Sequence, residues 1–488
     1  MHASSDVSSL PPVADRNKKS QDDGRLSPTD EEPGNKTDTS GTGDFEAAHH
    51  EELSDGIFDG ENGKSFRNMS RWDALFALLC NQFGLGVLGL PGAMRDLGIV
   101  PGIIALIGIG CLSGYAGLEL LQFFERYPHV VNVIDMVRII GGRPWEIVAA
   151  IGLIIQLLMT CASTAVTLSV ALNTLSDHGM CTVGFIGIAC IACFLLCVPR
   201  TAKFIAHSGV PTVISIVIAA LIVMISLGAS SPPKAPPGWD VSIEVVATPS
   251  FRKIFNACLR IVFAFAGNIT FVSFMAEMRN PVRDFPYALS GLIGISIGFY
   301  VILAVTIYCL AGEYTTSPAL GSAPIIPAKV AYGIVIPAVM TAGLANGHVG
   351  IKYVYVQVLR WMKRTHEATS NSAFSWGVWL GSVTVFWIAS FLVSNVIPIF
   401  DSILSISSAT TYAWFTYGIS ACLWFHLNKG RYFDGPKQIA YLCLNVFLIG
   451  FSFLLNGAGL WASMTELLDL FKAGGVRGVF DCGNNAIF

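Results

Sequence analysis

The sequence predicts an all-α integral membrane protein, and three observations point to this fold class. Of the 488 residues, 53% are hydrophobic and only 13% carry a charge, whereas a soluble protein has about 25% charged residues. Eleven apolar stretches are long enough to cross a bilayer as helices. The first and the sixth of these stretches are each interrupted by glycine near the middle, and glycine weakens a helix.

Residues 1–70 contain no apolar run and are rich in Ser, Asp, Glu, Gly and Pro. Such a segment cannot bury enough surface to fold alone, so we expect a disordered cytoplasmic tail and no secretory signal peptide. Two interpretations of the tail stay open. It is either a solvated leader or a regulatory segment that binds a ubiquitin-ligase adaptor. The lysines that would accept ubiquitin are Lys18, Lys19, Lys36 and Lys64.

The eleven predicted spans make up a transmembrane domain over residues 71–463, and residues 464–488 form a C-terminal tail. In chain order the spans cover residues 74–93, 99–124, 146–175, 182–198, 207–228, 255–276, 287–311, 330–359, 374–397, 399–425 and 438–462. With the N-terminal tail in the cytoplasm, the cytoplasmic connections carry more Lys and Arg than the opposite ones. This bias is typical of the cytoplasmic side, so the C-terminal tail is predicted to be extracellular.

The two interrupted spans occupy corresponding positions in the chain. The first, Ala74–Ala93, contains Gly84 and Gly86, and the sixth, Phe255–Ala276, is interrupted at Gly267. They lie five spans apart, and an odd number of spans inverts the second copy. The sequence therefore predicts a five-plus-five inverted repeat followed by an eleventh helix. A broken helix frees backbone groups that hydrocarbon cannot satisfy, and paired breaks of this kind indicate the binding site of a secondary transporter.

Other kinds of site are not recognisable in the sequence. A net charge of −3 and the lack of a basic patch argue against a nucleic-acid partner. Residues 84–89 match the dinucleotide pattern Gly-x-Gly-x-x-Gly, but that motif requires a preceding β-strand in a soluble domain. We find no nucleophile–base pair and no cluster of metal ligands. The sequence thus predicts neither an enzyme nor a cofactor or metal site.

Several motifs resemble those of a known family. Residues 84–93, GLGVLGLPGA, resemble the Gly-x-Gly-Ile-Leu-x-Leu-Pro signature of the amino acid/auxin permease family. Residues 277–286, EMRNPVRDFP, are similar to the family's loop after the sixth helix. Residues 346–355 and 177–182 resemble the fungal neutral amino acid permeases of the methyltryptophan-resistance type. The resemblance covers residues 66–488 and not the N-terminal tail.

The resemblance implies a LeuT-type fold with broken helices 1 and 6. It also implies a plasma-membrane location and proton-coupled uptake of neutral (aliphatic or aromatic) amino acids by alternating access. Two alternatives stay open. The chain is an exporter of the same family in the vacuolar membrane, or it is an amino acid sensor that does not transport and signals through its tail.

An amino acid zwitterion fits the chemistry of both breaks. The half-helix that begins after Gly86 offers N–H groups and the positive end of its dipole to a carboxylate, and carbonyls at the second break can accept hydrogen bonds from an ammonium group. The predicted substrate contacts are Gly84, Leu85, Gly86, Val87, Phe265, Ala266, Gly267 and Asn268. Alternatively, the glycines allow close helix packing, Asn268 holds the unwound turn, and Phe265 is a core residue.

Proton coupling is predicted to involve His348 and Lys352, which share one helix face with Thr341 and Ala345. In LeuT-type transporters this part of the eighth helix helps to bind sodium, and a cation on the chain would replace it. Lys352 alternatively snorkels to the membrane surface, and His348 alternatively makes a structural hydrogen bond. Glu119 and Asp401 are further candidates for the coupling residue.

A disulfide is predicted between Cys181 and Cys482. In the eleven-span topology, these are the two cysteines of the twelve that lie outside the spans or at their edge on the extracellular face. The outside of the cell is oxidising, which favours a bond between them. The alternative is two independent thiols, because no spacing in the sequence fixes the distance between the two residues.

Overall fold

The computed structural model describes residues 69–200, 203–364, 367, 370, 372–474 and 478–485. In this part of the chain every regular element is a helix, so the predicted all-α class is confirmed. Of the predicted N-terminal tail, only Met69 and Ser70 are among the described residues. The proposed ubiquitin-acceptor lysines and the contact with a ubiquitin-ligase adaptor lie outside them.

The first predicted span is broken in the structure. Helix α2 covers Arg71–Gln82 and is capped by Ser70, whose side chain accepts a hydrogen bond from the backbone N–H of Asp73. A 3₁₀ helix, η1, Leu85–Gly89, follows the break and leads into α3, Leu90–Leu97. The axis turns by 48° across this break. The glycines in this stretch thus end one helix and start another, as expected from their low helix propensity.

Four helices lie between the two breaks. They are α4 (Ile99–Arg126), α5 (Val133–Ser176), α6 (Thr182–Cys197) and α7 (Lys203–Ala229). Helix α5 begins well before the predicted start at residue 146. It bends sharply at Gly142, where φ is 69°. Such a positive φ favours glycine, so the residues before the bend form a separate helical turn on a different axis.

The sixth predicted span is also broken. Helix α8 covers Phe251–Ala264 and α9 covers Asn268–Glu277. The chain continues through α10 (Pro281–Ala311), the short 3₁₀ helices η2 (Gly312–Tyr314) and η3 (Ala319–Ser322), and α11 (Ile325–Trp361).

The last third of the chain contains three π-helical segments. The elements are α12 (Ala373–Val396), α13 (Phe400–Ser407), the π-helices η5 (Ser408–Tyr412) and η6 (Trp414–Gly418), α14 (Ile419–Leu427), α15 (Pro436–Leu454), the π-helix η7 (Leu455–Gly459) and α16 (Leu460–Lys472). Helix α16 therefore extends beyond the predicted domain boundary at residue 463. Wide helical turns of the π type are frequent at functional sites.

Eight helices of the described part are long and apolar enough to cross a membrane, or nine when the bent pair of α2 and the segment Leu85–Leu97 counts as one span. The sequence predicted eleven. Part of the difference has a simple cause. Helix α6 is apolar but has only 16 residues, and the predicted span 399–425 is divided into short α and π segments.

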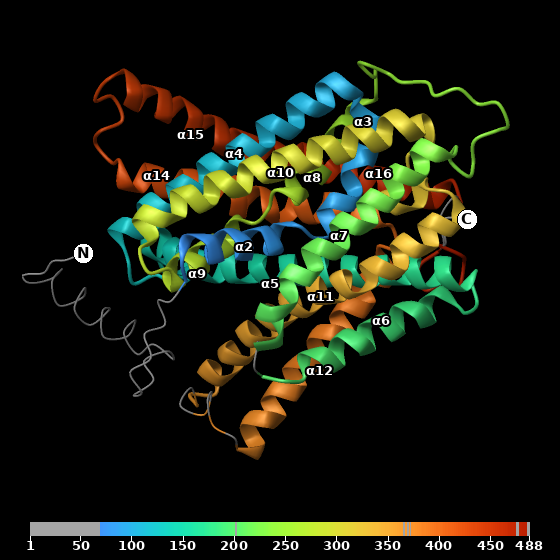
Figure 1. Cartoon of the computed structure of the whole chain (residues 1–488). Coiled ribbons are helices and arrows are strands. Elements are labelled where there is room, and N and C mark those ends of the chain that lie inside the picture. Colours follow the sequence, from blue (N-terminus) through green and yellow to red (C-terminus); the bar gives the residue numbers. More distant parts are fainter. Residues whose placement is uncertain are drawn as a thin grey trace, which may run out of the picture. The chain divides into compact units, whose positions relative to one another are not determined.

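Helices far apart in the sequence pack together (Figure 1). Helix α11 packs against α5 and α7, and α10 packs against α4 and α2. The halves of the two broken spans are also in contact, since α3 packs against α8 and η1 against α8. Apolar side chains on the outer faces of the helices, such as Ile104, Ile191 and Ile225, are more than half exposed. This pattern is typical of a surface that faces lipid.

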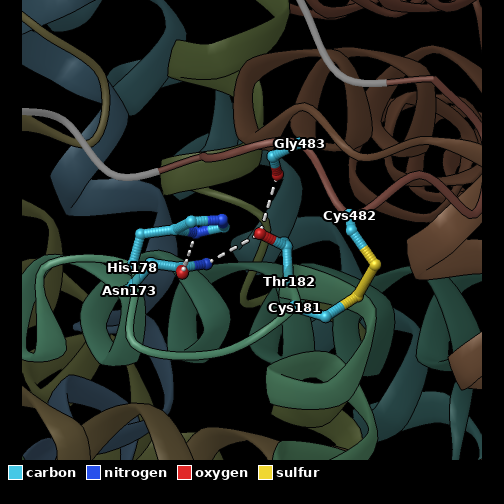
Figure 2. Close-up of a disulfide and its surroundings, with 6 residues drawn as sticks. All are labelled: Asn173, His178, Cys181, Thr182, Cys482 and Gly483. Carbon is cyan, nitrogen blue, oxygen red and sulfur yellow. Dashed lines mark hydrogen bonds between the residues drawn. A yellow bond between two sulfur atoms is a disulfide. The ribbon is translucent and has the colours of Figure 1, made fainter.

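Residues 478–485 are attached to the start of α6 (Figure 2). Cys181 and Cys482 form a disulfide bond, with their Cα atoms 4.7 Å apart. The hydroxyl of Thr182 donates to the carbonyl of Gly483 at 2.8 Å. Asn485 donates to Ser169 on α5 at 3.0 Å. The structure thus brings together the two cysteines that the sequence analysis paired, and it adds polar contacts around them.

Labelling of thiols with a membrane-impermeant maleimide on intact cells tests this bond. We expect no label at Cys181 or Cys482 in the unreduced wild-type protein, because neither sulfur is a free thiol. The Cys181→Ser variant should gain one labelled site, at Cys482, and a double variant that also carries Cys482→Ser should lose it again. Equal labelling of the wild-type protein and Cys181→Ser before reduction would show that no bond forms.

We call the end of the helix bundle that carries this bond the disulfide end, and the other the opposite end. At the disulfide end, the segment between α7 and α8 covers the turn from α3 to α4, and Figure 1 shows it beside α3. The N–H of Val100 donates to the carbonyl of Val245 there, at 3.0 Å. At the opposite end, Met69 pairs through its backbone with Glu277 and Arg279, at 3.1 Å each. This pairing joins the start of α2 to the end of α9.

Candidate functional site

A small cavity lies where the two broken spans meet. Its volume is about 80 Å³. The lining residues come from both breaks and from α5, α11 and η5: Asn81, Gln82, Gly84, Leu85, Gly86, Gln156, Thr160, Phe263, Ala264, Ala266, Gly267, Ile269, Thr270, Ala342, Asn346 and Tyr412. Among these described residues none is charged. The cavity therefore suits a ligand without a net charge.

The first break places the start of η1 at the cavity, where the N–H of Gly84 is taken up by the carbonyl of Gln82 at 3.0 Å. The chain leaves the helical conformation at Phe83 and Gly84, and η1 begins at Leu85. The first N–H groups of a helix have no partner within it and carry the positive end of its dipole. Gly84, Leu85 and Gly86 all line the cavity. This break can therefore bind a carboxylate without a basic side chain.

The second break is a tight turn whose carbonyls are partly occupied by the protein. The N–H groups of Phe265 and Ala266 donate to the carbonyls of Val262 and Phe263, at 3.2 and 3.3 Å. Ser113 of α4 donates its hydroxyl to the carbonyl of Phe265 at 2.9 Å. The backbone of Ala266 and Gly267 faces the cavity.

Tyr300 of α10 connects the two breaks. Its hydroxyl lies 3.2 Å from the carbonyl of Gln82, which ends α2, and 3.2 Å from the carbonyl of Ala264, which ends α8. The side chain is fully buried. A single hydroxyl group thus lies within hydrogen-bond distance of backbone carbonyls at the ends of two helices. The sequence analysis did not single out Tyr300, because a tyrosine in an apolar span carries no distinctive signal.

The two breaks touch at Gly86. A Cβ atom at this position would lie 2.7 Å from the Cα atom of Ala264 and 3.0 Å from a ring carbon of Phe263. The first of these atoms belongs to the backbone and cannot move cheaply. Glycine is therefore required at residue 86 by the close approach of α8.

Of the eight predicted contact residues, five line the cavity and three do not. Asn268 is fully buried and exchanges hydrogen bonds with Ser113, as acceptor at 2.8 Å and as donor at 3.1 Å. Phe265 packs against the ring of Tyr300, with 5.2 Å between the ring centroids. Val87 is buried outside the lining. Asn268 thus holds the unwound turn, which is one of the two roles that the sequence left open.

Two aromatic residues line the cavity, Phe263 and Tyr412, and the predicted Phe265 is not one of them. The ring of Phe263 packs edge-on against Tyr412 of η5, with 5.1 Å between centroids. The hydroxyl of Tyr412 lies 2.8 Å from that of Thr160 on α5. Phe263, Tyr412 and Thr160 thus form one wall that joins α5, α8 and η5. The cavity is lined by Phe263 rather than by the predicted Phe265 because of the way α8 is rotated about its axis. The sequence does not determine this rotation.

Two glutamines bring unused hydrogen-bond acceptors to the cavity. The side-chain oxygens of Gln82 and Gln156 have no hydrogen-bond partner among the described residues, and both side chains are buried. The amide nitrogen of Gln82 donates to Ser296 at 2.9 Å, which fixes the orientation of its amide. Buried acceptors are normally paired, so these oxygens are suited to N–H donors of a ligand. The sequence analysis missed both residues.

His348 and Lys352 do not reach the cavity. His348 is buried, and its Nε2 atom lies 3.2 Å from the carbonyl of Pro199, while its ring packs near Trp379. Lys352 is exposed and interacts electrostatically with Glu277, at the end of α9. Helix α11 instead presents Ala342 and Asn346, on a different face, to the cavity. The hydrogen bond of His348 matches the structural role that the sequence left open.

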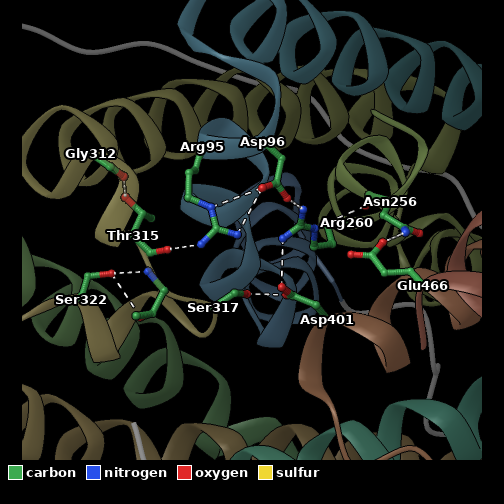
Figure 3. A network of polar contacts seen from close by, with 11 residues as sticks. Arg95, Asp96, Asn256, Arg260, Gly312, Thr315, Ser317, Ser322, Asp401 and Glu466 are labelled. Carbon is green, nitrogen blue, oxygen red and sulfur yellow. Dashed lines mark hydrogen bonds and ion pairs between the residues drawn. The ribbon is translucent and has the colours of Figure 1, made fainter. Parts of the chain in front are cut away.

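A network of ion pairs lies one helical turn from the second break, and Figure 3 shows its residues. Its centre is Arg260 of α8, one helical turn from Ala264, with a side chain that is only 3% exposed. The guanidinium pairs with Asp96 of α3 and, at 3.0 Å, with Asp401 of α13. Asp96 also pairs with Arg95 at 3.1 Å.

The network joins elements that belong to different parts of the chain. Arg95 donates to the carbonyl of Thr315 at 2.6 Å, and Ser317 donates its hydroxyl to Asp401. Helices α3, α8 and α13 and the segment before α11 are thus held together at this level. The sequence analysis considered Asp401 as a coupling residue but did not identify Arg260 as its partner. A buried cation of this kind is strongly stabilised only while its carboxylates are in place.

The chain is similar to known proteins over most of its length. The family model described as transmembrane amino acid transporter protein matches residues 67–465. A transmembrane transporter of Fusarium pseudograminearum is 29% identical over 431 residues, which cover 88% of this chain and 90% of the relative. The N amino acid transport system protein of Neurospora crassa is 28% identical over 443 residues, which cover 88% of this chain and 93% of the relative.

Proposed function

Because this chain belongs to the transmembrane amino acid transporter family, the amino acid/auxin permease family that its motifs resemble, we propose that it imports neutral amino acids together with protons across the plasma membrane. Membership of the family implies transport rather than catalysis. The observation that carries the proposal is the cavity between the two breaks, which offers polar groups but no charged side chain among the described residues.

A neutral amino acid matches this cavity at both of its charged groups. The N–H groups at the start of η1 suit the carboxylate, and the free oxygen of Gln82 suits the ammonium group. The wall of Phe263 and Tyr412 suits an apolar side chain. A substrate with a second charge would be left without a counter-charge in the cavity, which costs several kcal/mol or more in a buried site. We therefore expect discrimination against acidic and basic amino acids.

The proposed architecture is a LeuT-type fold with eleven passes. It counts α2 with α3, and α8 with α9, as single broken spans. It also counts the short helix α6, and the run from α13 to α14, as spans. The meeting of the two breaks at one cavity supports an arrangement of two inverted five-helix repeats, because transporters of this type bind substrate at the repeat interface.

The proposed orientation places the N-terminus in the cytoplasm and the disulfide end outside. Connections at the opposite end are rich in basic residues. Examples are Arg279 and Arg283, around the start of α10, and Lys363 and Arg364, after the end of α11. This is the bias of cytoplasmic loops. The ion-pair network around Arg260 then closes the cavity toward the outside, and alternating access requires α3, α8 and α13 to separate there.

Uptake by purified protein in liposomes tests the proposal. We expect labelled neutral amino acids to accumulate when the outside is more acidic than the inside, in the absence of sodium. A protonophore should abolish the accumulation, and labelled glutamate and lysine should not enter. Accumulation that requires sodium would contradict proton coupling. Binding of an amino acid without counterflow would point to a sensor, and protein confined to vacuolar membranes in cells would point to the exporter.

A further inference from the structure

We propose that the carboxyl group of Glu119 in α4 is a proton-binding site of the transporter. This inference rests on the proposed function and names a site for its coupling ion. It differs from the assignment of coupling to His348 and Lys352, which have other partners: His348 lies at the carbonyl of Pro199, and Lys352 interacts with Glu277. Three features of the structure carry it: the burial of Glu119, the absence of a cation beside it among the described residues, and its position on the helix that holds the second break.

Glu119 is almost completely buried, with 1% of its surface exposed. Neither of its carboxyl oxygens has a hydrogen-bond partner among the described residues. A carboxylate without a partner in an apolar interior costs several kcal/mol, and the group avoids this cost by binding a proton. In the state described by the structure, Glu119 therefore holds a proton. An ionisable side chain at membrane depth is by default a functional group.

The polar groups that act on Glu119 come from two helices. Tyr115 lies one turn earlier on α4, and Asn445 lies on α15. Asn445 donates its amide to the hydroxyl of Tyr115 at 2.8 Å, and its own oxygen has no partner among the described residues. Tyr441 of α15 stacks on Tyr115, with 6.3 Å between ring centroids. None of these three side chains is a cation.

Among the described residues, no cation acts on Glu119. Helices α3 and α8 also pack on α4, but their arginines Arg95 and Arg260 are paired with Asp96. Helices α9 and α10 face α4 with apolar side chains, since a Cβ at Gly117 would contact Phe271 and Leu289. The titratable groups on η6 and α14 are Tyr417, Cys422 and His426. Tyr417 directs its hydroxyl to the carbonyl of Ile109, at 3.5 Å. Cys422 is only partly buried.

His426 lies farther along α4, toward the opposite end. Its ring is 6.1 Å from that of Phe123, and its Nε2 atom is 3.5 Å from the hydroxyl of Tyr127. Phe123 is one turn beyond Glu119 and Tyr127 is two turns beyond it. His426 is exposed, and its ring contacts Phe123 and Tyr127 rather than Glu119.

The position of Glu119 links its proton to the substrate cavity. Helix α4 also carries Ser113, which binds both the carbonyl of Phe265 and the side chain of Asn268 at the second break. With the proton bound, the carboxyl group is neutral, and α4 is stable in its contact with Asn445 and Tyr441 of α15. When Glu119 loses the proton, its carboxylate is charged. Arrangements of the helices in which water reaches α4 are then more stable. Movement of α4 shifts Ser113, and with it the turn that lines the cavity.

The test compares Glu119→Gln with Lys352→Ala and His348→Gln, in liposomes. Glutamine mimics the protonated carboxyl but cannot release a proton. We expect Glu119→Gln to keep counterflow of a labelled neutral amino acid within about twofold of the wild-type rate, since exchange needs no net proton movement. Accumulation driven by a pH gradient should fall at least tenfold, and substrate-induced proton entry, followed with a pH-sensitive dye, should vanish. Lys352→Ala and His348→Gln should retain both the accumulation driven by a pH gradient and the substrate-induced proton entry.

A second variant covers the possibility that Glu119→Gln does not fold. Asn445→Leu removes a polar neighbour, which makes the charged form of Glu119 less stable. Because the surroundings of the carboxyl group then differ, the pH dependence of uptake should differ from that of the wild-type protein. A wild-type pH profile in both Glu119→Gln and Asn445→Leu would overturn the inference. Loss of coupling in Lys352→Ala alone would overturn it in favour of the sequence-based assignment.

The same measurements separate this inference from the proposed function. A wild-type protein that catalyses counterflow but shows no accumulation in a pH gradient would overturn the proton site while leaving amino acid transport intact. A wild-type protein without counterflow would overturn the proposed function itself.

Discussion

Replacing Gly86 with alanine is expected to reduce the uptake of neutral amino acids at least tenfold. The added methyl carbon would lie 2.7 Å from the Cα atom of Ala264, so α8 or η1 must shift. Overpacking of this kind costs about 1–3 kcal/mol, and the shift occurs where both breaks line the cavity. Initial rates of uptake, normalised to the amount of protein at the membrane, measure the effect.

Variants of two further glycines are controls for this prediction. A Cβ at Gly267 would meet the side-chain oxygen of Gln82 at 3.1 Å and a ring carbon of Phe271 at 3.3 Å, so Gly267→Ala should be milder than Gly86→Ala. A Cβ at Gly108 on α4 meets nothing within 4 Å, so Gly108→Ala should transport at the wild-type rate. Equal rates in the variants of residues 86 and 108 would show that the close contact between the breaks has no role.

Replacing Arg260 with methionine is expected to have the largest effect on stability. The substitution keeps most of the side-chain volume but leaves Asp96 and Asp401 without their shared cation. Breaking a buried ion pair by removing one partner typically costs about 3–5 kcal/mol. We expect a clear fall in the thermal unfolding midpoint of the purified protein and loss of uptake, because α3, α8 and α13 are no longer held together.

Another arginine on the same helix is a matched control. Arg252 also lies on α8 and pairs with Asp469, but both side chains are exposed, at 40% and 53%. Water screens an exposed ion pair, so Arg252→Met should change the unfolding midpoint little. Asp401→Asn should lie between the two, since Arg260 keeps its pair with Asp96. Similar midpoints for Arg252→Met and Arg260→Met would contradict a special role for the network.

The sequence predicted the breaks correctly because their cause is local. Glycines at residues 84, 86 and 267 weaken the helix where they stand, and the structure ends α2 and α8 just before them. The side chains that face the cavity could not be predicted in the same way. Their direction depends on how each helix is rotated about its axis, which places Phe263 rather than Phe265 in the lining.

The partners of polar residues in the spans could not be predicted from the sequence either. Arg260 stands beside Asp96 and Asp401 although these residues are far apart in the chain. The meeting of three helices creates the network, and no spacing in the sequence indicates it. Gln82 and Gln156 likewise acquire their significance from the cavity, because only the packed structure leaves their oxygens without partners. Lys352 stood out by its charge, yet the rotation of α11 directs it away from the cavity.

Binding of a labelled neutral amino acid to the purified protein tests the central claim most directly, namely that the cavity between the breaks holds the substrate. We predict saturable binding to the wild-type protein and to Gly108→Ala, with no competition from glutamate or lysine. Gly86→Ala should lose the binding while its thermal unfolding shows that it remains folded. Unchanged affinity in folded Gly86→Ala, or equal competition by charged amino acids, would contradict the assignment of the substrate to this cavity.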